Sequence, residues 1–214
     1  EEVAAVVWMT PQEASQKLTY SHDQEQLDAL TELHAKGLLN TKPLIVLRHG
    51  KARSRSTWNG NEAIRPLLSD GNDQAEALAS ILKGYGAKLI FSSPWTRCLS
   101  TIAPYAQNLN VKVRTAPELT EASNAKRPEL TKLTVEALIN LNKAVVACTH
   151  RPVLPTIIEQ LETRTDRKLK AKLHLISLLK PGSFAVVHLS LNDDPIKRVI
   201  VDIEIHSPNL PKKK

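Results

Sequence analysis

The chain has 214 residues, of which 42% are hydrophobic and 24% are charged, and its formal net charge at pH 7 is +7. This composition is typical of one globular domain, or of one domain with an appendage. No apolar run approaches the roughly 20 residues of a membrane span, and the N-terminal "EEVAAVVWMT" lacks the basic region of a signal peptide. Two cysteines, Cys98 and Cys148, are too few for a disulfide framework, so we expect a cytoplasmic protein.

Much of the positive charge lies in the segment "RTDRKLKAK" at 164–172 and in the C-terminal "PKKK". Such an excess can favour nucleic acids, membrane surfaces or small polyanions. Solvated surface is the simpler interpretation, and aromatic residues, at 4%, are too scarce to form stacking platforms for single-stranded nucleic acid. We therefore expect neither a nucleic-acid polymer nor a membrane as a partner, and the oligomeric state stays open.

In chain order, the first expected element is a strand at residues 3–8, "VAAVVW". The motif "TPQE" at 10–13 is a capping box with proline at the first helical position, which predicts a helix start. A second helix is expected at 23–36, and Gly37 can end it. The segment "LLNTKP" is typical of a linker, so we expect one part at 1–40 and a separate domain at 41–214.

From residue 42 onward, expected strands alternate with expected helices. The strands are "PLIVLRH" (43–49), "AKLIFSS" (87–93), "VKVRTA" (111–116), "KAVVACTH" (143–150), "SFAVVHLSL" (183–191) and "IKRVIVDIEI" (196–205). The helices are expected at 71–83, 94–109, 127–142 and 151–162. This alternation predicts an α/β fold of three layers, with a mostly parallel central sheet covered by helices on both faces. The last two strands are expected to be antiparallel.

Polar and ionisable side chains gather where three of these strands end. They are Arg48 and His49, then Ser92 and Ser93 with Arg97 one helical turn later, then Thr149 and His150, while Glu118 and Glu121 are expected in a loop after the strand at 111–116. Because ligands bind beyond the carboxyl ends of parallel strands, we expect these groups to meet at one edge of the sheet.

This set of side chains suits phosphoryl transfer. Arginine binds phosphate oxygens with two hydrogen bonds, and a neutral imidazole can attack phosphorus. Neighbouring arginines favour the neutral imidazole, and a carboxylic acid can protonate the leaving oxygen. Each residue alone has an ordinary structural explanation, such as a core histidine or a surface arginine. Their joint placement at strand ends favours the functional interpretation.

Four segments resemble the motifs of the histidine phosphatase superfamily, which has the phosphoglycerate-mutase-like fold. "LRHGKA" is similar to its RHG signature, and "RPLLSDGNDQAEALASIL" to its "RPL…G…QA" helix. "SSPWTRCLSTIAPYA" resembles its "SSP…RA…T" segment, and "VVACTH" its second-histidine strand. The segments occur in the family's order over roughly 42–206, and the ordered set is far more specific than the RHG tripeptide alone.

The resemblance implies a role for each matching residue. His49 corresponds to the phosphorylated nucleophile, and Arg48, Arg97 and His150 to the phosphate pocket. The acid/base maps onto Glu121 or Glu118, and we favour Glu121. In the branch that resembles small phosphohistidine phosphatases the acid is not at the usual place, so this choice stays open.

Further basic residues surround these motifs and are candidates for binding the rest of the substrate. They are Lys51, Arg53 and Arg55 in the loop "KARSRSTWNGNEAIR", Arg65 at the end of that loop, and Arg151 after His150. Arg151 departs from the small residue that many family members have, and a cation there would suit a substrate with more than one phosphate. The alternatives are a basic surface loop and, for Arg65, a salt-bridged scaffold residue.

The first forty residues resemble the last strand and closing helix of a Nudix (MutT-like) domain, through "VVWMTPQEASQKLTYSHDQEQLDAL". The Nudix box, whose glutamates hold the metal, is absent, so this chain should not carry out Nudix chemistry. The sequence also has no CX5R cysteine-phosphatase motif, no GxxxxGK[ST] phosphate loop and no HxxxH or HExxH grouping. We therefore expect no metal and no cofactor.

We expect a metal-independent phosphohydrolase that acts through a phosphohistidine and whose partner is a small phosphorylated substrate. The resemblance of residues 1–40 to a Nudix domain, next to a segment that resembles a histidine phosphatase, favours a nucleotide substrate. We expect removal of a terminal phosphate from nucleoside diphosphates, oxidised guanine nucleotides among them. One alternative is a protein phosphohistidine phosphatase. A second, from another class, is a regulatory module that binds phosphate with little turnover.

Overall fold

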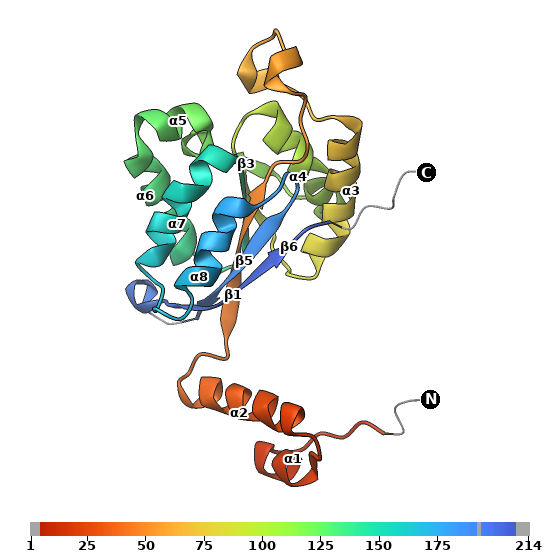
Figure 1. The fold of residues 1–214 in the computed structure, drawn as a ribbon, viewed down its shortest axis with the longest axis vertical. Helices are drawn as coiled ribbons and strands as arrows, with labels where there is room; N and C mark the ends of the chain where they lie inside the picture. The colour runs from red at the N-terminus through yellow and green to blue at the C-terminus, as the bar shows by residue number, and fades with distance from the viewer. Residues whose placement is uncertain (1–4, 192–193, 209–214) are drawn as a thin grey trace. The chain divides into compact units, whose positions relative to one another are not determined.

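The structure is a computed structural model that describes residues 5–191 and 194–208. The chain divides into two compact units, Glu1–Asn40 and Thr41–Lys214, each of which is described by itself (Figure 1). Among the described residues, no helix is both long enough and apolar enough to cross a membrane.

The first unit contains two helices, α1 (Pro11–Lys17) and α2 (Ser21–Ala35). The predicted capping box at the start of α1 is confirmed, because the Glu13 N–H donates to Thr10 Oγ1 at 3.3 Å and the Thr10 N–H donates to Glu13 Oε2 at 2.8 Å. Gly37, with φ of 67°, follows α2 in the left-handed conformation that glycine favours.

The strand expected at 3–8 is wrong for residues 5–8, which have no regular structure; residues 3 and 4 lie outside the described residues. A strand needs a neighbouring strand for its backbone hydrogen bonds, and each described strand belongs to the single sheet of the second unit. Trp8, at 102% relative exposure, contributes no burial that could stabilise an extended segment.

The second unit is built on one six-stranded sheet in the order β3-β2-β4-β1-β5-β6. The strands are β1 (Thr41–Arg48), β2 (Leu89–Ser92), β3 (Val113–Thr115), β4 (Val145–Thr149), β5 (Phe184–Ser190) and β6 (Ile200–His206). The β3–β2, β2–β4 and β4–β1 pairs are parallel, whereas β1–β5 and β5–β6 are antiparallel. The mostly parallel sheet and the antiparallel end strands are therefore confirmed.

Helices cover both faces of this sheet, as expected (Figure 1). Their bounds are α3 (Ser69–Lys83), α4 (Thr96–Leu109), α5 (Glu121–Lys126), α6 (Pro128–Asn140), α7 (Leu154–Glu162) and α8 (Lys170–His174). Alternate residues of β1 point to the two faces. Leu44 and Val46 belong to the core with α6 and α7, whereas Ile45 and Leu47 belong to the core with α3 and α4. Burial on both faces explains why β1 is continuously apolar.

The region of Glu118 and Glu121 differs from the expected loop. Glu121 is the first residue of the short helix α5, and Thr120 caps it by accepting the Ser123 N–H at 3.1 Å. Glu118 lies in a 3-10 turn at Pro117–Leu119. A helix of 6 residues is too short for a detectable apolar period, so this element could be found only through its cap.

The turn after β1 packs tightly against the start of α3. The Gly50 N–H donates to Thr101 Oγ1 at 2.8 Å. A Cβ atom on Gly71 would lie 2.1 Å from the Lys51 carbonyl oxygen, closer than packed atoms can approach. Only glycine at position 71 allows α3 to approach the backbone that follows His49.

We predict that Gly71→Ala lowers the free energy of unfolding by about 1–3 kcal/mol, although alanine is the better helix former, because the added methyl group overpacks the contact. Urea unfolding of the purified chain measures this. The matched control is Gly84→Ala at the end of the same helix, where the added Cβ would lie 3.4 Å from the nearest atom. Equal stability of the two variants would contradict the close approach.

Candidate active site

His49 follows the last residue of β1 and is held in one orientation. Its backbone N–H donates to the Thr149 carbonyl at 3.0 Å, which ties it to the end of β4. Its side-chain Nδ1 lies 2.8 Å from the Gly50 carbonyl oxygen, which can only accept, so Nδ1 carries the proton. Nε2 of the neutral ring is therefore unprotonated, and it accepts a hydrogen bond from Arg97 Nε at 3.2 Å.

The surroundings of His49 keep its ring neutral. Burial lowers the pKa of His49 from 6.5 to about 3; the hydrogen bond to Gly50 opposes this shift, and the charges of Arg97, Arg48 and Arg65 add to it. The residue as a whole is only 7% exposed. A neutral imidazole with an unprotonated Nε2 is the form that can attack an electrophile at neutral pH.

Arg97, in the first turn of α4, is fully buried and connects the site's groups. Besides His49, its guanidinium contacts Glu121 Oε1 at 2.8 Å and Glu62 Oε1 at 3.1 Å. It also lies over the Trp95 ring, 4.6 Å from the centroid. Burial lowers the pKa of Arg97, but an arginine keeps its proton in a protein. The residue thus brings a fixed positive charge to His49 Nε2.

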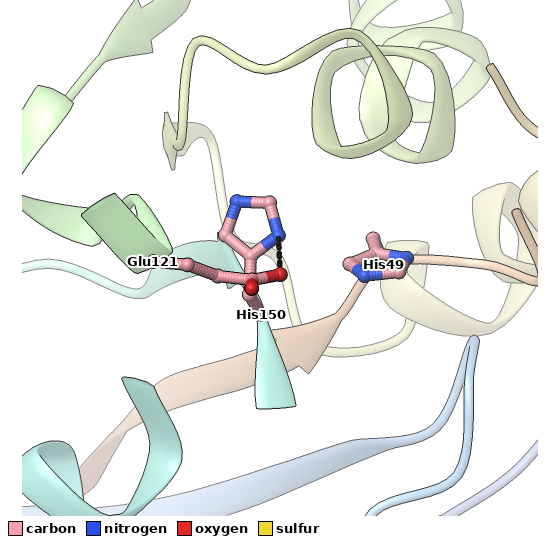
Figure 2. Close-up of side chains that lie close together, drawn as sticks. All are labelled: His49, Glu121 and His150. Carbon is pink, nitrogen blue, oxygen red and sulfur yellow. Dashed lines mark ion pairs between the residues drawn. The ribbon is translucent and has the colours of Figure 1, made fainter. Parts of the chain in front are cut away.

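His150 follows β4 and lies beside His49, with 5.2 Å between the ring centroids. Its Nε2 is 2.7 Å from Ser93 Oγ, and its Nδ1 is 3.4 Å from Glu121 Oε1 (Figure 2). Ser93 Oγ accepts the Trp95 N–H at 3.3 Å, so its own hydrogen is available to His150 Nε2. This leaves the ring proton on Nδ1, facing Glu121. Burial, with the charge of Arg97, lowers the pKa of His150.

Of the two carboxylates considered, the structure brings Glu121 to the histidines. Its side chain is 15% exposed and forms ion pairs with Arg97 and Arg55. Glu118 is not among the residues that line the cavity at His49. The cap at Thr120 and the turn of α5 are what direct Glu121 inward.

Glu62 is a site residue that the sequence interpretation missed. It forms ion pairs with Arg65 at 2.8 Å, Arg97 at 3.1 Å and Arg55 at 3.2 Å. Burial raises its pKa, but the hydrogen bond from Arg65 and the charge of Arg97 outweigh that effect, and the net pKa is lowered. Glu62 is the only acidic residue in the basic loop at 51–65. A lone carboxylate among several arginines is the feature of the sequence that could have identified it as a site residue.

An open cavity of about 730 Å³ lies over His49 and Arg48. All of the expected substrate-binding residues line it, namely Lys51, Arg53, Arg55, Arg65 and Arg151. Lys51 is paired with Asp70 at 2.7 Å, and Arg65 with Glu62. Arg53 and Arg151 form no ion pair within the described part of the chain, so their charges are available to an anionic ligand.

Three donors in the site are of the types that bind transition metals. The ligand atoms of His49, Glu121 and His150 all lie within 4.8 Å of one another (Figure 2). Arg97, however, already donates to His49 Nε2 and to Glu121 Oε1. A cation would have to displace this guanidinium and to enter a cluster of arginines. The arrangement is therefore better suited to an anion.

We predict that the buried neutral state of His49 makes folding sensitive to acid. Since the folded-state pKa lies below 6.5, its contribution to stability is complete above pH 6.5 and is lost as the pH falls toward 3. Between pH 7 and pH 4.5 this loss amounts to about 2–3 kcal/mol. Urea unfolding at both pH values should show a correspondingly weaker pH dependence in His49→Gln. An unchanged pH dependence in the variant would contradict the burial of a neutral ring.

Comparison with known proteins shows which family and which relatives the chain resembles. Residues 44–188 match the family model described as histidine phosphatase superfamily (branch 1). The chain is 33% identical over 159 residues to an 8-oxo-(d)GTP phosphatase of Mycolicibacterium smegmatis, a match that covers 74% of this chain and 48% of the relative. The chain thus spans about half the length of this curated relative.

Two solved structures share the fold. A putative phosphohistidine phosphatase SixA from Nakamurella multipartitia aligns with a TM-score of 0.60 and 20% identity, over 80% of this chain and 98% of that one. A putative SixA from Agrobacterium tumefaciens aligns with a TM-score of 0.55 and 24% identity, over 76% and 97%. At these identities the likeness is one of fold.

Proposed function

The chain belongs to the histidine phosphatase superfamily, and we propose that it is a phosphatase that acts through a phosphohistidine on His49. The observation that carries this proposal is the neutral, oriented ring of His49, whose Nε2 meets Arg97 at 3.2 Å. An unprotonated nitrogen beside a fixed cation is where an anionic phosphoryl group would bind and react.

In the first step, His49 Nε2 attacks phosphorus and the bond from phosphorus to the leaving oxygen breaks. Arg48, Arg97 and His150 hold the phosphoryl oxygens. Glu121 takes up a proton from solvent when the phosphoryl group displaces it from Arg97 and Arg55, and it gives this proton to the leaving oxygen. The phosphorylated ring keeps its proton on Nδ1, where the Gly50 carbonyl stabilises it.

In the second step, Glu121 takes a proton from a water molecule, which attacks phosphorus. The N–P bond then breaks, and inorganic phosphate leaves with the ring again neutral. In the free site Glu121 is bound to Arg97 and Arg55. Phosphate competes for the same guanidinium groups, and this competition frees the carboxyl group to exchange protons.

We expect the intermediate to be trapped chemically. Rapid quenching of the chain with a labelled phosphodonor should give a phosphoryl label that is acid-labile and base-stable, and His49→Ala should lose both the label and the turnover. His174→Ala, a substitution of an exposed histidine of α8, serves as the control. Full activity in His49→Ala would contradict the proposal, and phosphate binding without turnover would support a regulatory module instead.

For the substrate, we propose a nucleoside diphosphate that loses its terminal phosphate. The support is that Arg53 and Arg151, which form no ion pair among the described residues, line the same cavity as His49 and so suit a second phosphate. The curated relative is named for action on 8-oxo-(d)GTP. The alternative, a protein phosphohistidine, is supported by the SixA structures, which share the fold at under 25% identity.

We predict that Arg53→Ala and Arg151→Ala each raise the KM for GDP roughly tenfold and leave the KM for an aryl monophosphate nearly unchanged, because a lost charge-assisted contact to phosphate costs on the order of 1–2 kcal/mol. Phosphate release measures both constants. Arg167→Ala, which removes an exposed arginine outside the cavity, is the matched control. Equal effects on both substrates, or faster release from a phosphohistidine protein than from GDP, would favour the alternative.

A further inference from the structure

One part of the cavity over His49 is apolar, and the reaction at His49 does not use it. It is formed by Pro152, Pro155, Leu178 and Pro181, which we call the apolar wall. These residues come from two segments. Pro152 and Pro155 lie in the 3-10 turn Arg151–Val153 and the first turn of α7, and Leu178 and Pro181 lie at the end of the 3-10 helix Leu175–Leu178 and in the turn before β5. The basic residues 51–55 of the same cavity come from a third segment, after β1.

Leu178 is an exposed member of this wall, with a relative exposure of 70%. Its position is nevertheless fixed, because its neighbours Ile176 and Leu179 are buried in the core with 0% and 2% exposure. The Leu179 carbonyl oxygen also accepts a hydrogen bond from Arg48 Nη1 at 2.6 Å. The residue that follows Leu178 is thus bonded to Arg48, which also lines the cavity.

The proline residues make the wall rigid. Pro152 and Pro155 lie in the first turns of their helical segments, where proline's fixed φ is compatible with the backbone. A surface that is already ordered loses little conformational entropy when a ligand covers it. Exposed apolar surface inside a cavity is typical of a place where the apolar part of a ligand binds.

We propose that the apolar wall binds the nucleobase of a nucleoside diphosphate. The proposal rests on the proposed function, because it assumes that the terminal phosphoryl group lies at His49. Arg53, Arg151 and the apolar wall line the same cavity as His49. In the proposed pose the two arginines bind the second phosphate and the wall binds the nucleobase. The cavity of about 730 Å³ is within the range of small-molecule sites, about 300–1,000 Å³.

A second exposed leucine distinguishes a nucleobase from a protein surface as the occupant. Leu175 lies at the start of the same 3-10 helix and is 46% exposed, but it does not line the cavity. A small ligand inside the cavity contacts Leu178 and leaves Leu175 uncovered. A docked protein would extend over the rim, and its binding would depend on both leucines.

The test is a binding measurement, which does not depend on turnover. Calorimetry compares the Kd of α,β-methylene-GDP with that of methylenediphosphonate, which has the two phosphorus groups without a nucleoside. We expect Leu178→Ser to raise the Kd of the nucleotide analogue roughly tenfold, as the loss of a partly covered leucine predicts, and to leave the Kd of methylenediphosphonate unchanged. Leu175→Ser should change neither, and both variants should keep the wild-type Tm because both side chains are exposed.

The proposal is overturned if Leu178→Ser changes both Kd values alike or neither, or if the wild-type chain binds the two compounds equally well. It is also overturned if both leucine variants weaken binding of a phosphohistidine protein while the nucleotide analogue is unaffected. Failure of the proposed function would look different, since the wild-type chain would then release no phosphate from GDP even where the binding results hold.

Discussion

The hydrogen bond from His49 Nδ1 to the Gly50 carbonyl, 2.8 Å long, is the interaction on which the site depends. It decides which ring nitrogen has the proton, and therefore which nitrogen faces Arg97 and the cavity. The carbonyl is positioned in turn by the Gly50 N–H bond to Thr101 and by the close approach of Gly71. A sheet, a turn and two helices thus act together to orient a single imidazole.

Two carboxylates pair with three of the site's arginines. Glu62 pairs with Arg55, Arg65 and Arg97, and Glu121 pairs with Arg55 and Arg97. Buried guanidinium groups without partners would be costly, so the carboxylates stabilise the empty site. In the proposed mechanism, phosphate replaces Glu121 at Arg97 and so releases the carboxyl group that acts as the acid and base. Substrate binding and acid/base chemistry would then be coupled through this one exchange.

The sequence was enough to predict features that a short segment determines by itself. It was not enough for features that depend on contacts between distant segments. β1 and β4 were recognisable because their apolar runs end in Arg48, His49 and His150, and the parallel sheet brings those ends together. Glu62 was not foreseen, since its role depends on arginines from two other elements, and α5 is too short to show a period. The strand at 3–8 was wrong over residues 5–8, beside which the described part of the chain places no strand. The Nudix-like resemblance of residues 1–40 stays a prediction.

The protonation state of His49 tests the account most directly. Nitrogen-15 NMR of the histidine-labelled chain, with His49→Gln used to assign the signal, reports both the charge and the tautomer of the ring. The account predicts a neutral ring with the proton on Nδ1 that stays unchanged from about pH 7.5 to about pH 5, because burial and the neighbouring arginines lower the pKa to about 3. A ring that titrates near the ordinary value of 6.5, or one with its proton on Nε2, would contradict it.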